Sequence, residues 1–474
     1  MTEHDLPLCV DLDGTLLRSD LLVESALGLF KRNPLYLFAM LGWLLRGKAN
    51  LKYEIASRYQ PDFSSLPWDE RVLDLLRDAH GQRELVLCTA SDQRYADAIS
   101  EELGLFDRSF GSSATYNMEG RNKAAHLVKI FGERGFDYVA NSRTDLSVWA
   151  HARRAYLFNA SAGVAHEAGK LSEVAAVAPA QAGGIRAWLR ALRLHQWLKN
   201  LLVILPLLTA HRLLDPTATR EAIIAFFAFG LCASGVYVLN DLFDLGADRR
   251  HPRKRTRAFA AGTLPVLHGV FMAPLLTLVA FALAITMLPL GFVITLLVYN
   301  LATLAYSFGL KRVVMLDTVI LAGLYTLRII AGTLAIRSPI SFWLLAFSMF
   351  VFLSLAMLKR YTELKTVADA GGGGAGGRGY HSEDLSIVQS LGTASGYISV
   401  LVLALYINSS VSESLYRHAD WLWLLCPPFL YWISRTWLIA HRGLMHDDPV
   451  VFAVTDRVSQ VVFVLMAAIA VAAI

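Results

Sequence analysis

The chain has 474 residues, and its composition is 55% hydrophobic and 18% charged, with a formal net charge of +5. These proportions exclude an ordinary soluble protein, because soluble domains carry more charge and less apolar material. The apolar excess lies beyond about residue 195, so we expect an integral membrane protein with a soluble front end. We expect no nucleic-acid partner.

Three short apolar segments in the front end each finish in polar residues. The segments and the polar residues that follow them are 8–10 with Asp11 and Asp13, 85–88 with Thr89, and 138–140 with Asn141. Because helical stretches separate these segments, they predict a parallel α/β sheet with its site at the carboxyl ends of the strands. At such a site Asp11 can attack a phosphorus atom as a nucleophile, and Asp13 can shuttle the proton.

The order of these motifs resembles that of the haloacid dehalogenase (HAD) superfamily of phosphatases. The matching residues are Asp11, Asp13, Gly14 and Thr15, then Thr89, then Lys123. The resemblance implies a Rossmann-like domain in which Asp11 is the nucleophile and Asp13 is the general acid/base. It implies that Thr89 and Lys123 hold the phosphate. It also implies a Mg²⁺ ion on Asp11, on the carbonyl of Asp13 and on an acidic fourth motif.

The fourth motif departs from the family pattern. Its usual Gly-Asp pair is Ala140-Asn141 here, which leaves Asp145 as the only carboxylate for the metal. Losing one anionic ligand should weaken a Mg²⁺ site more than it weakens phosphate binding. Two hypotheses follow: the domain is an active phosphatase, or it only binds or senses phosphorylated ligands.

Residues 34–45, between the first two motifs, form an apolar segment that is too short to span a bilayer. The basic residues that flank it are Lys31, Arg32, Arg46 and Lys48. The segment is therefore either a helix that rests on the membrane surface or a cap that packs over the catalytic sheet. The domains that we expect are a phosphatase-like domain over 1–160, an Ala- and Gly-rich linker over 161–185, and a membrane domain over 186–474.

The second half of the chain contains apolar segments that predict a bundle of about nine transmembrane helices. They lie near 196–214, 221–240, 266–285, 287–305, 313–335, 340–358, 394–408, 419–440 and 456–474. If the front domain is cytosolic, the basic clusters between these segments also fall on the cytosolic side, as the positive-inside rule requires. We therefore expect a multi-pass protein of the bacterial inner (plasma) membrane with a cytoplasmic N-terminal domain.

A polar cluster follows directly on the apolar run 222–239. It consists of Asn240, Asp241, Asp244 and Asp248. On a helix the three carboxylates fall at i, i+3 and i+7 and share one face. A Mg²⁺ ion that carries a substrate diphosphate would relieve their repulsion, whereas the alternative is a solvated loop. The basic residues that would hold the remaining phosphate oxygens are Arg249, Lys254 and Arg255.

Further polar residues fall on the same cytosolic face by this helix count. We expect substrate binding by Lys199, Tyr306, Lys311, Lys359 and Arg360. Arg328 would lie deep in a helix, where an unpaired charge is costly. It is therefore either a functional residue or one that pairs with carbonyls of a neighbouring helix. The glycine-rich loop 371–384 is either a mobile lid over the site or a plain connector.

The spacing of Asn240, Asp241, Asp244 and Asp248 resembles the first acidic motif of the UbiA superfamily of intramembrane transferases. That resemblance implies a Mg²⁺–diphosphate site at the cytosolic mouth of a helical bundle. Most members prenylate aromatic rings and carry a second acidic cluster. The corresponding region here offers only Asp317.

The surrounding sequence is instead similar to one branch of the superfamily, the decaprenyl-phosphate phosphoribosyltransferases. The matching stretches are 196–200, 248–255, 261–262, 306–311, 328–332 and 359–361. The similarity implies 5-phosphoribosyl transfer from phosphoribosyl pyrophosphate (PRPP) to a polyprenyl phosphate in the bilayer, with the front domain as phosphatase of the product. The alternative is aromatic or quinone-type prenyl transfer, with a front domain of separate or purely phosphate-binding role.

Overall fold

The computed structural model describes residues 6–180, 183–369, 379–445 and 448–474. The chain forms two compact units: one consists of Met1–Leu192 with Tyr237–Ala273, and the other of Arg193–Val236 with Pro274–Ile474. The segment that carries the three aspartates, which the sequence assigned to the membrane domain, therefore belongs to the same unit as the front domain. Most of the glycine-rich loop lies outside the described residues.

The first unit contains a six-stranded sheet in which every strand pair is parallel. The strands, in the spatial order β3-β2-β1-β4-β5-β6, are Arg108–Ser112, Leu85–Asp92, Leu8–Val10, Asp137–Ala140, Arg154–Ala160 and Glu173–Pro179. Cys9 of β1 lies opposite Val86 of β2 and Tyr138 of β4. The predicted parallel α/β domain is confirmed, and this register brings the carboxyl ends of the three motif-bearing strands to one edge.

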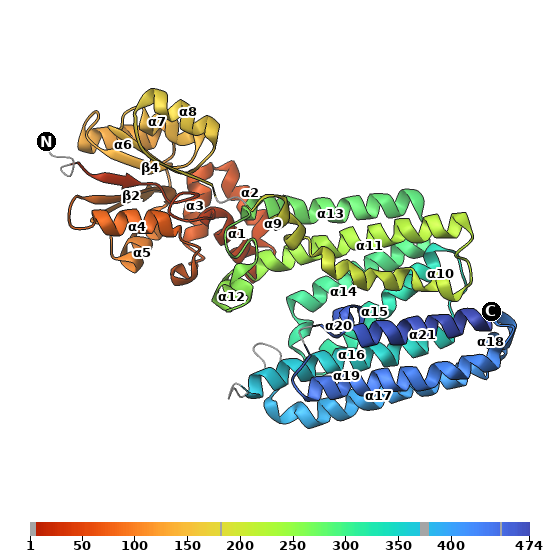
Figure 1. The fold of residues 1–474 in the computed structure, drawn as a ribbon. Helices are drawn as coiled ribbons and strands as arrows, with labels where there is room; N and C mark the ends of the chain where they lie inside the picture. Colours follow the sequence, from red (N-terminus) through yellow and green to blue (C-terminus); the bar gives the residue numbers. More distant parts are fainter. Residues whose placement is uncertain (1–5, 181–182, 370–378, 446–447) are drawn as a thin grey trace. The chain divides into compact units, whose positions relative to one another are not determined.

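Helices cover both faces of the sheet (Figure 1). On one face lie α4 (Glu70–Ala79) and α5 (Gln93–Leu103), and on the other lie α6 (Arg121–Phe131), α7 (Leu146–Trp149) and α8 (Ala162–Leu171). The alternation of side chains along β1 explains both cores, because successive residues of a strand point to opposite faces. Leu8 and Val10 join the α4–α5 core, whereas Cys9 joins the core beneath α6, α7 and α8.

The linker predicted over 161–185 is wrong for most of its length. Residues 162–171 form α8, and β6 pairs with β5 along the register Ala155 to Val174 and Leu157 to Val177. The alanine content suggested a connector, but β6 also contains Val174 and Val177, and valine favours strands. The sheet therefore extends to Pro179.

A helical insert separates β1 from β2. It consists of α1 (Leu21–Arg32), α2 (Tyr36–Leu45) and α3 (Lys48–Ala56). Asp20 caps α1, because its carboxylate accepts the backbone N–H of Val23 at 3.0 Å. In the same unit Val23 and Leu27 pack against a core that includes Leu242 and Val266. The insert is thus attached to the segment that carries the aspartates.

Among the described residues, six helices are long and apolar enough to cross a membrane, or seven if the bent pair α20–α21 is one span. They are α11 (Pro216–Phe243), α13 (Val266–Met287), α14 (Leu290–Phe308), α15 (Leu316–Ala335), α16 (Phe342–Asp369) and the segment Ser382–Ile407 that contains α17, with α20 (Pro449–Thr455) and α21 (Arg457–Ala473) as the pair. The expected bundle is present, and by length and composition six or seven of the nine predicted segments qualify as spans among the described residues. Residues near 196–214 form the 3₁₀ helix η3 (Leu194–Val203) and the short α10 (Leu205–Thr209), and 419–440 forms η7 (Ala419–Leu425) and the 16-residue α19 (Cys426–His441).

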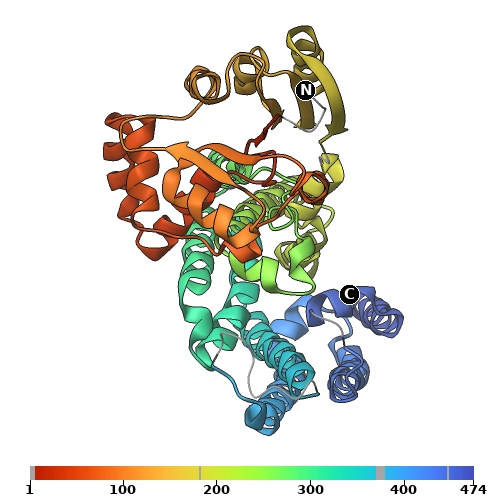
Figure 2. The same ribbon diagram turned by 90° about the vertical axis from the view of Figure 1, so that its left-hand side faces the viewer.

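The helices of the second unit run side by side in both views (Figures 1 and 2). Neighbouring pairs include α14 with α15, α15 with α16, α16 with α17, and α17 with α19. Their core is rich in aromatic rings, as shown by Tyr325 of α15, which stacks on Phe352 of α16 with centroids 5.1 Å apart. Each of these large rings buries a large apolar area between the helices.

Candidate active sites

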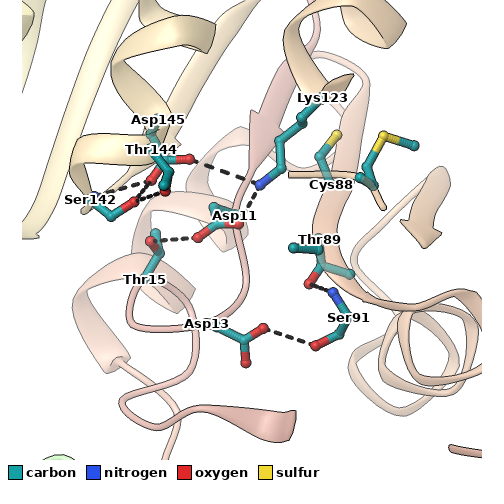
Figure 3. Close-up of polar contacts among 12 residues, drawn as sticks. Asp11, Asp13, Thr15, Cys88, Thr89, Ser91, Lys123, Ser142, Thr144 and Asp145 are labelled. Atoms are coloured by element: carbon teal, nitrogen blue, oxygen red, sulfur yellow. Dashed lines mark hydrogen bonds and ion pairs between the residues drawn. The ribbon is translucent and has the colours of Figure 1, made fainter. Parts of the chain in front are cut away.

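The first polar cluster lies at the carboxyl edge of the sheet (Figure 3). Asp11 follows β1, and Lys123 reaches it from the first turn of α6 with 2.5 Å between Nζ and Oδ1. Thr15 donates its hydroxyl to the other Asp11 oxygen at 3.3 Å. Burial raises the pKa of Asp11 to about 6, although the charge of Lys123 opposes this shift. The pKa of Lys123 is also raised, because Asp11 and Asp145 outweigh the effect of its own burial.

Asp145 anchors the loop after β4 rather than presenting a free carboxylate. Its Oδ1 accepts the hydroxyl of Tyr138 at 2.8 Å and lies 3.9 Å from Lys123 Nζ. Its Oδ2 accepts the N–H of Ser142 at 3.1 Å and also the Ser142 hydroxyl. No group of three acidic, His or Cys side chains in the described part of the chain is arranged to hold a metal. In this structure the Asp145 carboxylate holds the loop after β4, and its use as a metal ligand stays a prediction.

Asp13 connects the sheet to the helical insert. Its Oδ2 accepts the hydroxyl of Ser91 at 2.9 Å, and its Oδ1 accepts the backbone N–H of Leu21, the first residue of α1, at 2.8 Å. Burial raises the pKa of Asp13 to about 7, with a further contribution from the negative charge of Asp20. A carboxyl group with this pKa can hold and release a proton near neutral pH.

Two other predicted positions lie at the same edge. Thr89 is fully buried, and its hydroxyl accepts the N–H of Ser91 at 3.0 Å. Asn141 lies against Gly14, where a Cβ would come within 2.3 Å of the Asn141 amide nitrogen. Gly14 has φ of +78°, so both its conformation and its surroundings require glycine. The carboxyl ends of β1, β2 and β4 thus carry the motif residues together, as the sequence predicted.

The aspartate cluster, also in the first unit, does not present one continuous helical face. Helix α11 ends at Phe243, Asp244 has non-helical backbone angles, and α12 runs from Leu245 to Arg250. Asp241 and Asp248 converge on the guanidinium of Arg257, at 3.1 and 2.7 Å. Asp244 instead lies 3.3 Å from Lys31 of α1. Among the described contacts, Arg257 therefore joins Asp241 to Asp248, and Lys31 pairs with Asp244.

The basic residues after the cluster have different environments. Arg249, predicted to hold phosphate, is buried and donates to both oxygens of Glu24 at 2.8 and 2.6 Å. Lys254 and Arg255 are exposed on a short 3₁₀ turn. In this structure Arg249 joins α12 to α1 through its ion pair with Glu24, and its predicted contact with phosphate stays a prediction. Removing either partner of such a buried pair would leave the other charge without a partner.

One helix links the two clusters of the first unit. The first N–H of α1, that of Leu21, donates to Asp13, and Lys31 in its last turn lies beside Asp244. Between them Glu24 pairs with Arg249. Twelve residues of α-helix are about 18 Å long, so this is the length of helix between the two clusters.

The second unit contains a cationic cluster around Arg328 of α15. One turn further along, Gly332 permits η3 to approach, because a Cβ there would lie 2.0 Å from the carbonyl oxygen of Val203. This approach places Asn200 of η3 beside Arg328, with 3.2 Å between Oδ1 and Nε. Arg328 also donates to the hydroxyl of Tyr299 at 2.8 Å and to the carbonyl of Leu324 at 2.6 Å.

Every one of these partners of Arg328 in the described residues is neutral. The cation is also flanked by the rings of Phe229, Tyr299 and Tyr325, with 4.8 to 5.5 Å to the ring centroids. The amide nitrogen of Asn200 is buried without a hydrogen-bond partner among the described residues. The buried guanidinium of Arg328 and the buried amide nitrogen of Asn200 together fit an anionic ligand. A buried charge without a counter-charge and a buried donor without an acceptor are both unfavourable in free energy.

Two lysines of the same unit share one carboxylate. Lys199, one residue before Asn200 on η3, forms an ion pair with Asp448, and Lys359 of α16 lies 3.8 Å from the same aspartate. Lys199 is also 5.7 Å from the Tyr325 ring. Together with Arg328, these residues carry more positive than negative charge, which again favours an anion.

Arg360, the neighbour of Lys359, lies in a different environment, and its predicted contact with substrate stays a prediction. It is almost fully buried and forms ion pairs with Asp317 and Glu363, and it donates to the hydroxyl of Tyr306 at 3.1 Å. Tyr380 donates to Asp317 at 2.7 Å. Arg360 and Tyr306 therefore belong to a satisfied network between helices. Lys311 is partly exposed in the 3₁₀ turn after α14.

Four residues that shape these sites were missed from the sequence: Tyr138, Asn200, Arg257 and Asp448. Tyr138 is a strand residue, and Asp448 lies far along the chain from its partners, so neither carries a local signal. Arg257 closes a basic run, where its pairing with two aspartates could not be distinguished from general positive charge. Asn200 follows Lys199 directly and was the most accessible of the four to sequence analysis.

These features define an integral membrane protein whose helical bundle is joined to a parallel α/β domain. The UbiA prenyltransferase family matches residues 201–452, and the chain belongs to that family of transferases. The uncharacterized protein y4nM of Sinorhizobium fredii is 38% identical over 98% of this chain and 90% of its own length. The nodulation protein NoeC of Azorhizobium caulinodans is 39% identical over 57% of the chain and 88% of its own. A decaprenyl-phosphate phosphoribosyltransferase of Mycolicibacterium smegmatis is 32% identical over 58% of the chain and 88% of its own length.

Proposed function

We propose that the membrane bundle transfers a 5-phosphoribosyl group from PRPP to a polyprenyl phosphate. We propose further that the α/β domain, acting as a HAD-type phosphatase, hydrolyses the 5-phosphate of the lipid product. Both sites face the cytoplasm, with the protein in a bacterial inner membrane. The observation that carries this proposal is the pairing in one unit of a carboxylate cluster suited to a metal diphosphate with a strand-edge site suited to a phosphate ester.

In the transfer step the bond from the sugar C1 to the diphosphate breaks, and a bond from C1 to an oxygen of the polyprenyl phosphate forms. Asp241 and Asp248 fit a divalent cation, because they already converge on the positive charge of Arg257. A Mg²⁺ ion held there would neutralise charge on the leaving diphosphate. In the second unit, the cations at Arg328, Lys199 and Lys359 have the charge to bind a phosphate group. The resemblance to the phosphoribosyltransferase of Mycolicibacterium smegmatis supports this choice of substrates.

In the phosphatase step an oxygen of Asp11 attacks phosphorus, and the ester bond to the sugar oxygen breaks. The proton of Asp13 passes to that oxygen, and Asp13 then takes a proton from the water that cleaves the aspartyl phosphate. Lys123 keeps Asp11 in position and offsets the charge of the transferred group. The Asp11 carboxylate, the main-chain carbonyl of Asp13 and the amide of Asn141 are the oxygen ligands available to Mg²⁺ at this edge.

The test uses purified membranes that contain the full chain. PRPP labelled in the ribose is incubated with Mg²⁺ and decaprenyl phosphate, and the organic phase is counted and analysed for phosphate. We expect label to enter the lipid and to appear as the dephosphorylated ribosyl product. Label that never enters the lipid, together with transfer from a prenyl diphosphate to an aromatic acceptor, would overturn the transfer assignment. A labelled product that keeps its 5-phosphate would leave the front domain as a binding module.

A further inference from the structure

Helix α2 of the insert exposes most of its apolar side chains. None of its ten residues is buried, and the exposed fractions of Leu37, Phe38 and Leu41 are 49%, 70% and 54%. Leu44 and Leu45 follow at 46% and 91%. These positions recur at i, i+4 and i+7, so they form one continuous apolar face. Exposing such an apolar face to water is unfavourable in free energy. The face therefore indicates a surface that contacts another protein or a membrane.

The attachment of α1 fixes where α2 begins. The ring of Phe30 stacks on that of Phe243 with centroids 5.9 Å apart, and Lys31 Nζ donates to the carbonyl of Phe243 at 2.5 Å. Phe243 is the last residue of α11, a 28-residue membrane helix. Such a helix is about 42 Å long, which exceeds the roughly 30 Å hydrocarbon core, so its end lies in the interfacial layer. Only residues 33–35 separate α1 from α2, and they span at most about 11 Å.

The charges around α2 fit a lipid surface. Between positions 31 and 48 the chain has four basic residues and no Asp or Glu, and the basic residues are Lys31, Arg32, Arg46 and Lys48. All four are exposed. The partly buried side of α2 carries Tyr36 and Trp43, whose rings lie 6.1 Å apart, and Arg58 lies 4.8 Å from the Trp43 ring. Trp43 therefore contacts Arg58 of the same domain, whereas the leucines of α2 are exposed.

We propose that α2 lies flat in the interfacial layer of the bilayer, with the face formed by Leu37, Phe38, Leu41, Leu44 and Leu45 among the acyl chains. Three of the flanking basic residues, Arg32, Arg46 and Lys48, contact lipid phosphates, whereas Lys31 is held by Asp244 and the Phe243 carbonyl. Ten helical residues are about 15 Å long, too short to cross the membrane, so a parallel orientation is the one that buries this face. The α/β domain is thereby held against the surface on which its lipid substrate lies. This docking does not depend on which group the bundle transfers.

The test measures where residue 41 lies in the full-length protein. Leu41→Cys is labelled with an environment-sensitive fluorophore in a Cys426→Ser background, because Cys426 is the native cysteine that is not buried. Reconstituted vesicles contain phosphatidylglycerol and lipids with nitroxide groups at a shallow acyl position. The matched control is Glu101→Cys on α5, an exposed residue of the same unit. Labelling an exposed site leaves the core intact, so folding is preserved in both variants.

We expect lipid nitroxides to quench the label at position 41 at least threefold more than the label at 101, and aqueous iodide to show the reverse. Equal access of iodide to both labels would overturn the proposal. A label at 41 that neither quencher reaches, with disulfide-linked dimers of the unlabelled variant, would assign the face to a second copy and also overturn it. The double variant Leu37→Gln/Leu41→Gln should lose severalfold activity on a lipid phosphate ester in vesicles while keeping its activity on a soluble one.

Discussion

The two units of the chain solve the problem of buried charge in opposite ways. At the sheet edge Asp11 and Asp145 lie beside one cation, Lys123, and Asp13 accepts the Ser91 hydroxyl, so these carboxylates outnumber the lysine. Around Arg328 the excess is positive, and the immediate hydrogen-bond partners of the cation are neutral. At the first site the pKa values of Asp11 and Asp13 are raised, so these carboxylates can bind protons and lose their charge. Arg328 cannot lose its proton, so its charge stays. The sign of the excess charge at each site therefore indicates the charge of the group that the site binds.

The largest expected effect comes from the carboxylates that share Arg257. Asp241→Ala should lower the transfer rate by about 10³-fold or more, because it removes half of the pair that would hold a metal diphosphate. Asp244→Ala, whose carboxylate faces Lys31 instead, should also abolish transfer if it turns to the metal on substrate binding. Both are measured by label entering lipid, with exposed Asp62→Asn as the control. Near-normal transfer by Asp241→Ala would contradict the site.

Removing the nucleophile should affect only the other reaction. Asp11→Asn keeps the shape of the side chain but cannot attack phosphorus, so we expect phosphate release to fall about 10²- to 10⁴-fold and phosphorylated lipid product to accumulate. The rate at which label enters lipid should stay within twofold. Asp74→Asn, on the exposed side of α4, is the matched control. If wild type and Asp11→Asn give the same product, the front domain is not the phosphatase.

Substitutions of Arg328 test the cationic cluster of the second unit. Arg328→Gln should raise the KM for the lipid phosphate about 10- to 100-fold, since a charge-assisted hydrogen bond is worth about 1.5–3 kcal/mol. Arg328→Lys should recover part of the loss, because it restores charge without the planar fork. Exposed Arg312→Gln should leave KM unchanged. A kcat effect without a KM effect would show that Arg328 stabilises the bundle rather than the acceptor.

The smallest effect is a pH dependence confined to the front site. Asp11 must be ionised to attack and Asp13 must be protonated to donate, and their pKa values are raised to about 6 and about 7. Phosphatase activity should therefore peak between these values, fall as pH drops and Asp11 gains a proton, and fall as pH rises and Asp13 loses one. The two groups interact, so the measured pKa values belong to the pair. Transfer should stay nearly flat across this range, and a shared optimum would contradict separate sites.

The sequence by itself determined the parallel sheet, its motif residues and the presence of membrane helices. These follow from local patterns, because strand ends, apolar runs and short spacings are readable along the chain. It also located Asp11, Asp13, Lys123 and the aspartate cluster, since each belongs to a motif with fixed spacing.

Only the tertiary structure decided which charges meet. Arg257 lies on Asp241 and Asp248, Arg249 is taken by Glu24 across 225 residues of chain, and Asp448 lies beside Lys199. Charge pairing between distant segments has no local signature, because any acidic residue can neutralise any basic one that folding brings near. For the same reason the sequence could not distinguish Arg360, which is held by Asp317, from its neighbour Lys359. Likewise, Asp244 pairs with Lys31 of α1, whereas Asp241 and Asp248 pair with Arg257.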